Sequence, residues 1–311
     1  MRARKSDHLV ERAAERLLQA GALEGSAAQL LAPAGVQPVI ADAPAATEAL
    51  AVSPAPDLPP AEALAREQSK APRPIEAAAL QRVGMFDWSR GRSRISEEFR
   101  LAQRQILHAA FDPTAEAGVS NLVLVTSAKP GEGKTFAAAN LAGSVALQGD
   151  HEALLIDSDS KQDSLGQALG LAEAPGLLDL AADPKLDPAE VILRTGIEGL
   201  WLLPLGQERG RGSELLASRD MAQLIQRIGR RHAGRLLILD TAPCLSTSDP
   251  AALAHIVGQI LFVVEAERTQ REEIEAALDL VQACPLIMLL LNKVQVTNRY
   301  TFGAYSNYYS S

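Results

Sequence analysis

A glycine-rich loop near the middle of the chain has the residue types that bind phosphate. The segment 128–135 reads AKPGEGKT and approximates the G-x-x-x-x-G-K-[ST] pattern of a phosphate-binding loop, with alanine in place of the first glycine. Gly131 and Gly133 permit a tight backbone whose N–H groups converge on phosphate oxygens, and a helix beginning there directs its positive end at the same anion. We expect Lys134 to reach the β and γ phosphates and the Thr135 hydroxyl to coordinate Mg²⁺.

The alternative interpretation of this loop is a glycine-proline turn that enters a helix and carries an incidental lysine. A strand-like apolar run precedes the loop, a helical pattern follows it, and the GKT ending is complete. This context favours the phosphate site.

Three aspartates follow apolar runs and are suited to the same site. Asp157 and Asp159 lie in LLIDSDS, two residues apart and so on one side of an extended backbone, and Asp240 ends LLILD. Carboxylates beside a phosphate loop can hold Mg²⁺ and its water shell, and one can accept a proton from an incoming hydroxyl. The alternative is that these acids cap helices or lie solvated in loops. With the loop, they predict a site for a magnesium nucleoside triphosphate.

All four tyrosines of the chain lie in its last twelve residues. The segment around them, RYTFGAYSNYYSS, is rich in Gly, Ser and Asn and holds no acidic residue, so we expect a flexible tail over 294–311. Phenolic hydroxyls on such a tail can reach a γ phosphate, which makes the tyrosines candidate phosphoacceptors: Tyr300, Tyr305, Tyr308 and Tyr309. The alternative is a tail that stacks or assembles with a partner.

The elements that must position these residues are strands and helices in alternation. Six short, nearly all apolar runs are typical of strands buried on both faces: 121–127, 152–157, 200–205, 235–240, 259–265 and 285–292. Amphipathic segments between them predict helices, which implies a mostly parallel sheet flanked by helices. Ligands bind beyond the carboxyl ends of such strands, where the loop and the acids fall. The predicted fold class is α/β, a P-loop NTPase domain over 93–293.

The first 92 residues have a different composition. Apolar residues recur at helical spacing within 1–23, with charged residues opposite them, which predicts a short amphipathic helix. This helix is either a docking element for a partner protein or a marginal helix that frays. Nine of the 18 prolines fall between Pro33 and Pro74, in a stretch dominated by Ala, Pro and Glu. We therefore expect 24–92 to be a disordered N-terminal tether.

Composition and charge exclude several classes of protein. The net charge of −8 argues against a nucleic-acid binder, because such proteins normally present a basic surface. The apolar stretch 283–291 is interrupted by proline and falls short of the roughly 18 residues of a membrane helix. The charged N-terminus lacks the apolar core of a secretory signal. The two cysteines, Cys244 and Cys284, lack the spacing of a zinc site or disulfide framework. We expect a cytoplasmic protein.

Taken jointly, the motifs resemble those of the bacterial protein-tyrosine kinases of polysaccharide export, and within them the tyrosine autokinases of exopolysaccharide and exosortase (PEP-CTERM) loci. The likeness rests on SAKPGEGKT, LLIDSDS, LLILDTAP, the upstream ISEEFR at 95–100 and the tyrosine-rich end, and it covers roughly 93–311. It implies an ATP-dependent autokinase that uses ATP and Mg²⁺, phosphorylates its own C-terminal tyrosines and regulates exopolysaccharide polymerisation or export.

The resemblance also implies roles for individual residues. Asp157 resembles the acid that orients or deprotonates the tyrosine, while Asp159 and Asp240 resemble, with Thr135, the magnesium ligands. Lys129 matches a second lysine that reaches the nucleotide of a neighbouring subunit, but it is equally compatible with a solvated loop charge. The expected catalytic residues are Lys134, Asp157 and Asp159. The expected nucleotide-binding residues are Lys129, Gly131, Glu132, Gly133, Lys134, Thr135 and Phe136.

Members of the family act with partners, and the resemblance implies the same here. The helix that contains Glu97 and Arg100 packs between subunits of a ring, so that the tail of one subunit enters the site of the next. The implied partners are further copies of this chain, a membrane-anchored polysaccharide chain-length (co-polymerase) protein and a tyrosine phosphatase. The co-polymerase is expected to recruit the chain to the inner face of the plasma membrane.

The sequence departs from the family pattern at several positions. Gln103 stands where the interface helix usually repeats an arginine, Asp163 replaces a proline, and Lys161 replaces an arginine. The loop before SELLAS reads ERGRG instead of an Asn-Pro pattern. These departures concern the geometry of a ring more than ATP binding. The rival hypothesis is a partition-type switch ATPase with a deviant Walker A motif and no kinase activity, and a third is a nucleotide-binding scaffold that lost catalysis.

Overall fold

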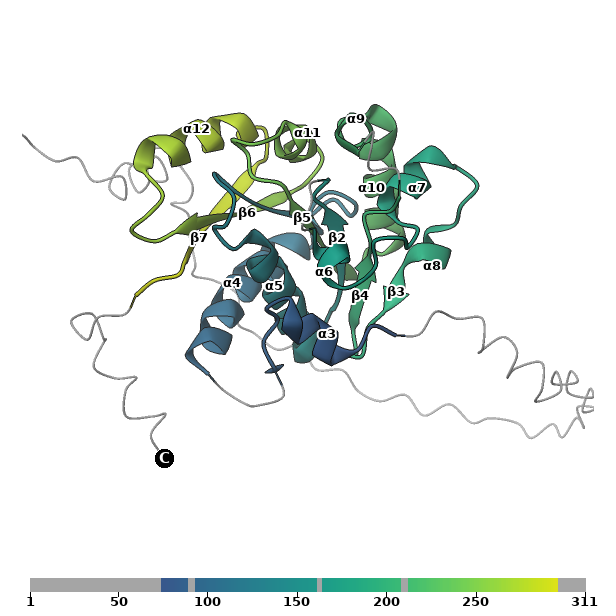
Figure 1. Ribbon diagram of the computed structural model, residues 1–311, viewed down its shortest axis with the longest axis horizontal. Coiled ribbons are helices and arrows are strands. Elements are labelled where there is room, and N and C mark those ends of the chain that lie inside the picture. Colours follow the sequence, from purple (N-terminus) through teal and green to yellow (C-terminus); the bar gives the residue numbers. More distant parts are fainter. Residues whose placement is uncertain (1–73, 89–92, 161–163, 208–211, 296–311) are drawn as a thin grey trace, which may run out of the picture. The chain divides into compact units, whose positions relative to one another are not determined.

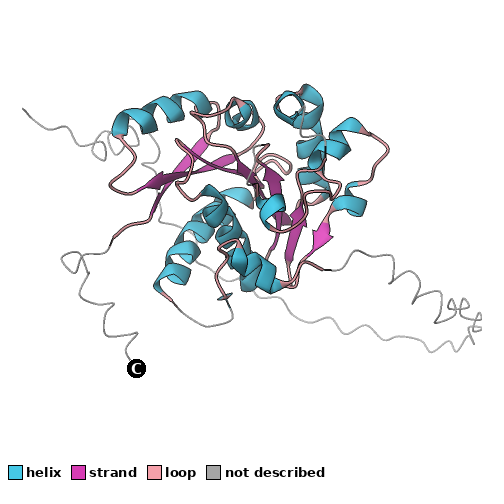
Figure 2. Cartoon of the chain, in the orientation of Figure 1, coloured by secondary structure: helices cyan, strands magenta, loops and turns pink. Residues whose placement is uncertain are grey.

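The computed structural model describes residues 74–88, 93–160, 164–207 and 212–295. The predicted N-terminal helix, most of the predicted tether and the four tyrosines lie outside these residues. The described residues contain a seven-stranded sheet with helices on both faces (Figures 1 and 2).

The strands lie in the order β3-β4-β2-β5-β1-β6-β7. Every neighbouring pair is parallel except β3 and β4, which are antiparallel. Their bounds are β1 Leu122–Ser127, β2 Glu152–Ser158, β3 Leu193–Arg194, β4 Leu200–Leu203, β5 Arg235–Thr241, β6 Gln259–Glu265 and β7 Leu286–Asn292. The strands β2, β5 and β1 are adjacent, so the three strands that precede the candidate site residues end side by side.

All six predicted strands are confirmed, as β1, β2, β4, β5, β6 and β7. The two-residue strand β3 was not predicted, because it is too short to form a periodic pattern. The expectation that every strand is buried on both faces is wrong for β7. This strand is at the edge of the sheet, and Leu289 and Leu291 are 61% and 60% exposed.

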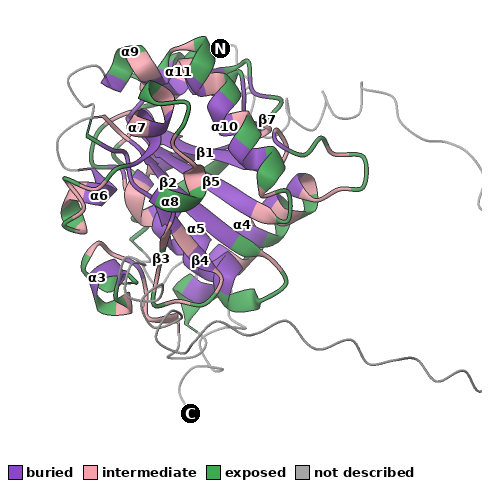
Figure 3. Cartoon of the chain, turned by 90° about the vertical axis from the view of Figure 1, so that its right-hand side faces the viewer, coloured by how far each residue is buried: buried purple, intermediate pink, exposed green. Residues whose placement is uncertain are grey.

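The helices cover the two faces of the sheet in two groups. On one face α3, α4, α5 and α6 pack against alternate strand residues, and on the other α7, α8, α9, α10, α11 and α12 do so. Figure 3 shows the central strands buried between these layers. The helix bounds are α3 Ala77–Arg82, α4 Arg94–Ala110, α5 Lys134–Gln148, α6 Leu165–Ala168, α7 Leu177–Ala182, α8 Pro188–Val191, α9 Gly212–Leu216, α10 Arg219–Arg231, α11 Asp249–Ala254 and α12 Arg271–Val281.

The segment 74–88 belongs to the packed domain, which corrects the prediction of a tether that extends to residue 92. Ile75 forms a β-bridge with Thr195, and Leu80 in α3 is fully buried. The side chain of Asn140 on α5 accepts a hydrogen bond from the Phe86 amide at 2.8 Å. Helix α3 is only six residues long and follows the proline-rich stretch, so its sequence alone is a weak signal, but the face of α5 gives it a surface on which to pack.

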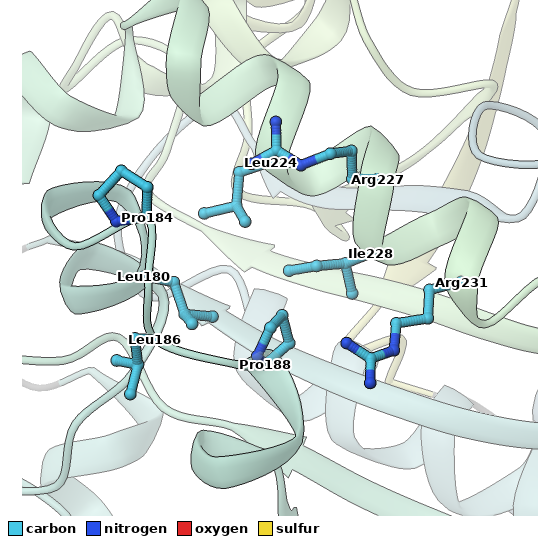
Figure 4. A pocket seen from close by; sticks show the side chains of 8 residues that line it. All are labelled: Leu180, Pro184, Leu186, Pro188, Leu224, Arg227, Ile228 and Arg231. Carbon is cyan, nitrogen blue, oxygen red and sulfur yellow. The ribbon is translucent and has the colours of Figure 1, made fainter.

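A pocket of about 230 Å³ lies between α10 and the α7–α8 region (Figure 4). Its lining comprises Leu180, Pro184, Leu186, Pro188, Leu224, Arg227, Ile228 and Arg231. Arg231 pairs with Asp187 at 2.7 Å. None of the lining residues belongs to the glycine-rich loop or to the strand ends that carry the acids.

Within the described part of the chain, no helix combines the length and the apolar character needed to cross a bilayer.

Candidate active site

The glycine-rich loop joins the end of β1 to the start of α5, as the sequence predicts. Gly131 and Gly133 have φ angles of 82° and 96°, in the left-handed region that other residues avoid, and α5 begins at Lys134 directly after Gly133. The first turn of α5 therefore faces the loop with free backbone N–H groups, which is the arrangement that binds phosphate.

The end of β7 holds the loop in place from the other side. The Asn292 amide nitrogen donates to the Glu132 carbonyl at 2.8 Å, and Lys293 Nζ donates to the Gly131 carbonyl at 2.7 Å. A Cβ atom at Gly133 would lie 2.1 Å from the Asn292 amide nitrogen, so this position also needs glycine for space. Sequence reasoning missed Asn292 and Lys293. Their signal was available, because they end a strand of the same parallel sheet.

Glu132 and Lys129 are tied to other parts of the domain. Glu132 is buried, and its carboxylate accepts hydrogen bonds from the Lys129 amide at 2.7 Å and from the Thr269 hydroxyl. Lys129 Nζ lies 2.8 Å from the carboxylate of Glu273 on α12, an ion pair that lowers the pKa of Glu273. The side chain of Lys129 therefore has a partner within the same chain, and Glu273 is a second residue that the sequence did not reveal.

Lys134 and Asp240 are two buried residues of opposite charge at the site. Lys134 is 8% exposed and Asp240 is 1% exposed. Burial raises the pKa of Asp240 to about 7, against the opposing effect of the Lys134 charge. Within the described residues neither oxygen of the Asp240 carboxylate has a hydrogen-bond partner of ordinary geometry, although the Thr135 hydroxyl is near enough to lower its pKa. A buried carboxylate of this kind needs a cation.

Asp157 lies on the neighbouring strand and is fully buried. Its carboxylate accepts hydrogen bonds from the Gly166 amide at 2.7 Å and from the Asp159 amide at 3.3 Å. Burial outweighs these bonds and raises its pKa to about 6. A carboxyl that titrates near neutral pH has the acidity that a general base requires. Asp159, two residues later, is only half-buried.

The residues at this site fit a magnesium ion. Asp240 supplies a buried carboxylate whose oxygens have no hydrogen-bond partner of ordinary geometry among the described residues, and Thr135 in the first turn of α5 places a hydroxyl near it. Among the described residues no three acid, histidine or cysteine side chains form a ready-made metal cage. Mg²⁺ does not require one, since it usually binds through one or two carboxylates together with substrate phosphates and water.

Phe136, predicted to contribute to the nucleotide site, has its ring in an aromatic cluster. Its ring centroid lies 5.4 Å from that of Phe86 and 6.0 Å from that of Phe99, and Trp88 joins the same cluster. The ring therefore packs the segment 74–88 and α4 against the start of α5. Because Phe136 lies in the first turn of α5, this packing helps to hold in place the turn that follows the glycine-rich loop.

Glu97 and Arg100, predicted at a subunit interface, lie on α4 and pair with each other at 2.8 Å. Gln103, three residues further along, is buried and accepts a 2.5 Å hydrogen bond from Ser144 on α5. At this position the helix therefore faces its own domain. The predicted phosphoacceptors Tyr300, Tyr305, Tyr308 and Tyr309 lie outside the described residues.

Comparison with known proteins identifies relatives of this chain, although no family model matches it. It is 32% identical over 237 residues to the succinoglycan biosynthesis transport protein ExoP of Rhizobium meliloti, and the alignment covers 74% of this chain and 28% of ExoP. It is 27% identical over 212 residues to the tyrosine-protein kinase YwqD of Bacillus subtilis, with 68% of this chain and 86% of YwqD covered. The chain thus spans little more than a quarter of ExoP.

Solved structures show the same fold. The kinase domain of the Escherichia coli tyrosine kinase ETK matches with a TM-score of 0.59 at 27% identity, over 79% of this chain and 91% of that domain. The chimerical protein CapA2B2 matches with a TM-score of 0.59 at 26% identity, over 76% of this chain and all of CapA2B2. The chain has bacterial tyrosine-protein kinases among its homologues, and its described domain has the P-loop fold of their kinase domains.

Proposed function

We propose that this protein is an ATP-dependent protein-tyrosine autokinase that phosphorylates its own C-terminal tyrosine cluster. One observation carries the proposal: the end of β7, which contacts the phosphate loop, comes shortly before the tyrosine-bearing segment in the sequence. Lys293 contacts the Gly131 carbonyl, and Tyr300 follows seven residues later.

The length of chain after β7 is compatible with this function. At about 3.3 Å per residue, the extended chain from Lys293 reaches about 23 Å at Tyr300 and about 50 Å at Tyr309. A tyrosine therefore comes within range of the site in the same chain or in an adjacent copy. Autophosphorylation is chemically favoured here because the acceptor is tethered, which raises its effective concentration at the site.

The reaction follows from the residues at the three strand ends. The tyrosine oxygen forms a bond to the γ phosphorus while the bond from that phosphorus to the β–γ bridging oxygen breaks, and ADP leaves. Asp157 accepts the phenolic proton, while Lys134 and the loop amides balance charge on the β and γ phosphates. Thr135, Asp159 and Asp240 would hold Mg²⁺, which would supply further neutralisation of phosphate charge.

The wider role that we propose is control of exopolysaccharide polymerisation or export. It is supported by the similarity of the chain to ExoP, a succinoglycan biosynthesis transport protein. The partners in this role are further copies of the chain, arranged through Glu97 and Arg100, a membrane-anchored co-polymerase that recruits the chain to the inner face of the plasma membrane, and a tyrosine phosphatase. We also propose that the protein is of the type encoded in exosortase (PEP-CTERM) loci.

Intact-mass measurement tests the catalytic proposal. The purified full chain, first treated with a tyrosine phosphatase, is incubated with MgATP, and we expect mass increments of whole phosphates that localise to 300–309. Lys134→Met should abolish them, because the γ phosphate loses its cationic partner. Lys185→Met changes an exposed lysine away from the site and serves as the matched control.

Two outcomes would contradict the proposal. Release of free phosphate from ATP with no phosphotyrosine would favour the switch ATPase. An unmodified tail together with tight MgATP binding and no turnover would favour the scaffold. A variant with all four tyrosines changed to Phe separates loss of acceptors from loss of catalysis, because it should still phosphorylate an added tyrosine-rich peptide.

A further inference from the structure

Asp249, a buried acid that the proposed reaction does not use, ties together two segments beside the site. It is the first residue of α11 and is fully buried. Its Oδ2 atom accepts a hydrogen bond from the Ser160 hydroxyl at 3.2 Å, and the Ser213 hydroxyl donates to the same oxygen at 3.4 Å. The two hydroxyls are also 3.2 Å apart.

The three residues come from distant parts of the sequence. Ser160 lies just beyond β2, Ser213 lies in α9, and Asp249 follows β5 by way of a short loop. Gly212 brings α9 against the β2 exit so closely that a Cβ atom there would lie 2.9 Å from Cβ of Ser160. Asp249 therefore joins three elements around one oxygen atom.

The position of Ser160 gives this junction a consequence for the site. Ser160 follows Asp159 directly in the sequence, so anchoring its side chain restrains the backbone that carries the Asp159 carboxylate. Asp159 is half-buried just beyond the end of β2, where its amide donates to the Asp157 carboxylate at 3.3 Å. The anchor is buried, and one of its carboxylate oxygens accepts from both hydroxyls.

We propose that Asp249 is a positioning residue for magnesium: through Ser160 it holds the β2 exit so that Asp159 faces the metal of a bound nucleotide. This inference rests on the proposed nucleotide site, but not on the identity of the phosphoacceptor. Partners of metal ligands that orient them in this way typically contribute 10- to 100-fold to metal affinity. Simple capping of α11 by Asp249 would leave magnesium affinity unchanged.

Nucleotide binding measured by fluorescence of a labelled ATP analogue tests the proposal on the full chain. Wild type, Asp249→Ala and Ser160→Ala are titrated with the analogue in EDTA and over a range of Mg²⁺ concentrations. In both variants we expect the Mg²⁺ concentration for half-maximal effect to rise about 10- to 100-fold. Affinity in EDTA should stay within about twofold, because the loop and Lys134 are untouched.

The controls separate positioning from folding. Asp249→Asn keeps an oxygen acceptor for Ser160 and should lie closer to wild type than Asp249→Ala. Asp220→Ala removes an exposed acid from the first turn of α10 and should change nothing. In the double variant Asp249→Ala with Ser160→Ala, the two effects should not add, since both break one junction.

Two results would overturn the inference. One is an unchanged Mg²⁺ midpoint in Ser160→Ala and Asp249→Ala, whatever happens to thermal stability. The other is an equal loss of affinity with and without Mg²⁺, which would show a general collapse of the site. If wild type binds no nucleotide under any condition, the proposed function fails first, so that failure is distinguishable from these.

Discussion

Asp157 and Asp240 are direct register partners on the adjacent parallel strands β2 and β5. Both are buried, and the charge of Asp157 adds to the effect of burial in raising the pKa of Asp240. The pairing places a carboxyl with a pKa raised to about 6 next to one with a pKa raised to about 7, and the Lys134 charge acts on the second. Two adjacent buried carboxylates lower the stability of the folded protein unless a cation lies between them. The pairing of Asp157 with Asp240 should therefore destabilise the nucleotide-free protein.

The first prediction concerns the stability cost of Asp240. Its folded pKa is raised above the unfolded value, so the cost is full above about pH 7 and disappears as the pH falls toward 4. Asp240→Asn should therefore raise the melting temperature of the nucleotide-free protein by several degrees at pH 8, and by much less at pH 5. Thermal unfolding at the two pH values measures this difference.

The control for this prediction is Asp220→Asn, which alters an exposed acid on α10. It should show no such dependence on pH. MgATP should stabilise wild type more than Asp240→Asn, because the variant has lost a carboxylate that holds the metal. An Asp240→Asn protein that is less stable than wild type at pH 8 would contradict the argument.

The second prediction concerns the space at Gly133. Gly133→Ala places a Cβ atom against the Asn292 amide group and forces an alanine to adopt a φ of 96°. We expect a loss of roughly 1–3 kcal/mol in unfolding free energy from backbone strain, together with loss of the Asn292 hydrogen bond to Glu132. Chemical denaturation and nucleotide titration measure both effects.

Gly131→Ala is the matched control for Gly133→Ala. It has the same left-handed strain, with a φ of 82°, but a Cβ atom there meets nothing within 4 Å. The difference between the two variants isolates the contact with Asn292. Equal losses in the two would show that Asn292 moves aside without cost.

The third prediction concerns the ion pair between Lys129 and Glu273. Glu273→Gln frees the Lys129 side chain, so that it can turn toward bound phosphate. Partly exposed ion pairs contribute little to stability, so we expect an unchanged melting temperature and ATP affinity that increases by about two- to fivefold. Isothermal titration at low and high salt measures the gain, which should shrink as salt screens the charge.

The neighbouring pair on α12 provides the control. Glu275→Gln breaks the 2.7 Å pair with Arg271 and removes the same charge from the same helix without touching Lys129. A gain in ATP affinity in Glu275→Gln equal to that in Glu273→Gln would mean that net charge, and not release of Lys129, is responsible.

The fourth prediction tests the place of the segment 74–88 in the fold. Leu80→Ala removes a fully buried side chain and should lower the unfolding free energy by about 2–5 kcal/mol. Leu147→Ala makes the same change at a residue that is 48% exposed and should have a small effect. Were residue 80 part of a disordered tether, the two variants would be equally stable.

The main features of the fold could be predicted because they depend on local pattern. Buried parallel strands require continuous apolar runs, so β1, β2, β5 and β6 are evident from residues next to one another in the chain. The phosphate loop is equally local, since Gly131, Gly133 and Lys134 must be adjacent to curve around an anion. The strand β3 and the helix α3 lack such a pattern, because they owe their structure to neighbours distant in sequence.

The sequence by itself determined the chemistry that is available: a phosphate loop, three strand-end aspartates and four clustered tyrosines. The tertiary structure alone decided how those groups are held. The pairing of Asp157 with Asp240, the contact of Asn292 with Glu132 and the ion pair between Lys129 and Glu273 join residues more than eighty positions apart. Burial and strand register determine these contacts. Both arise only when the strands pair and the helices pack against the two faces of the sheet.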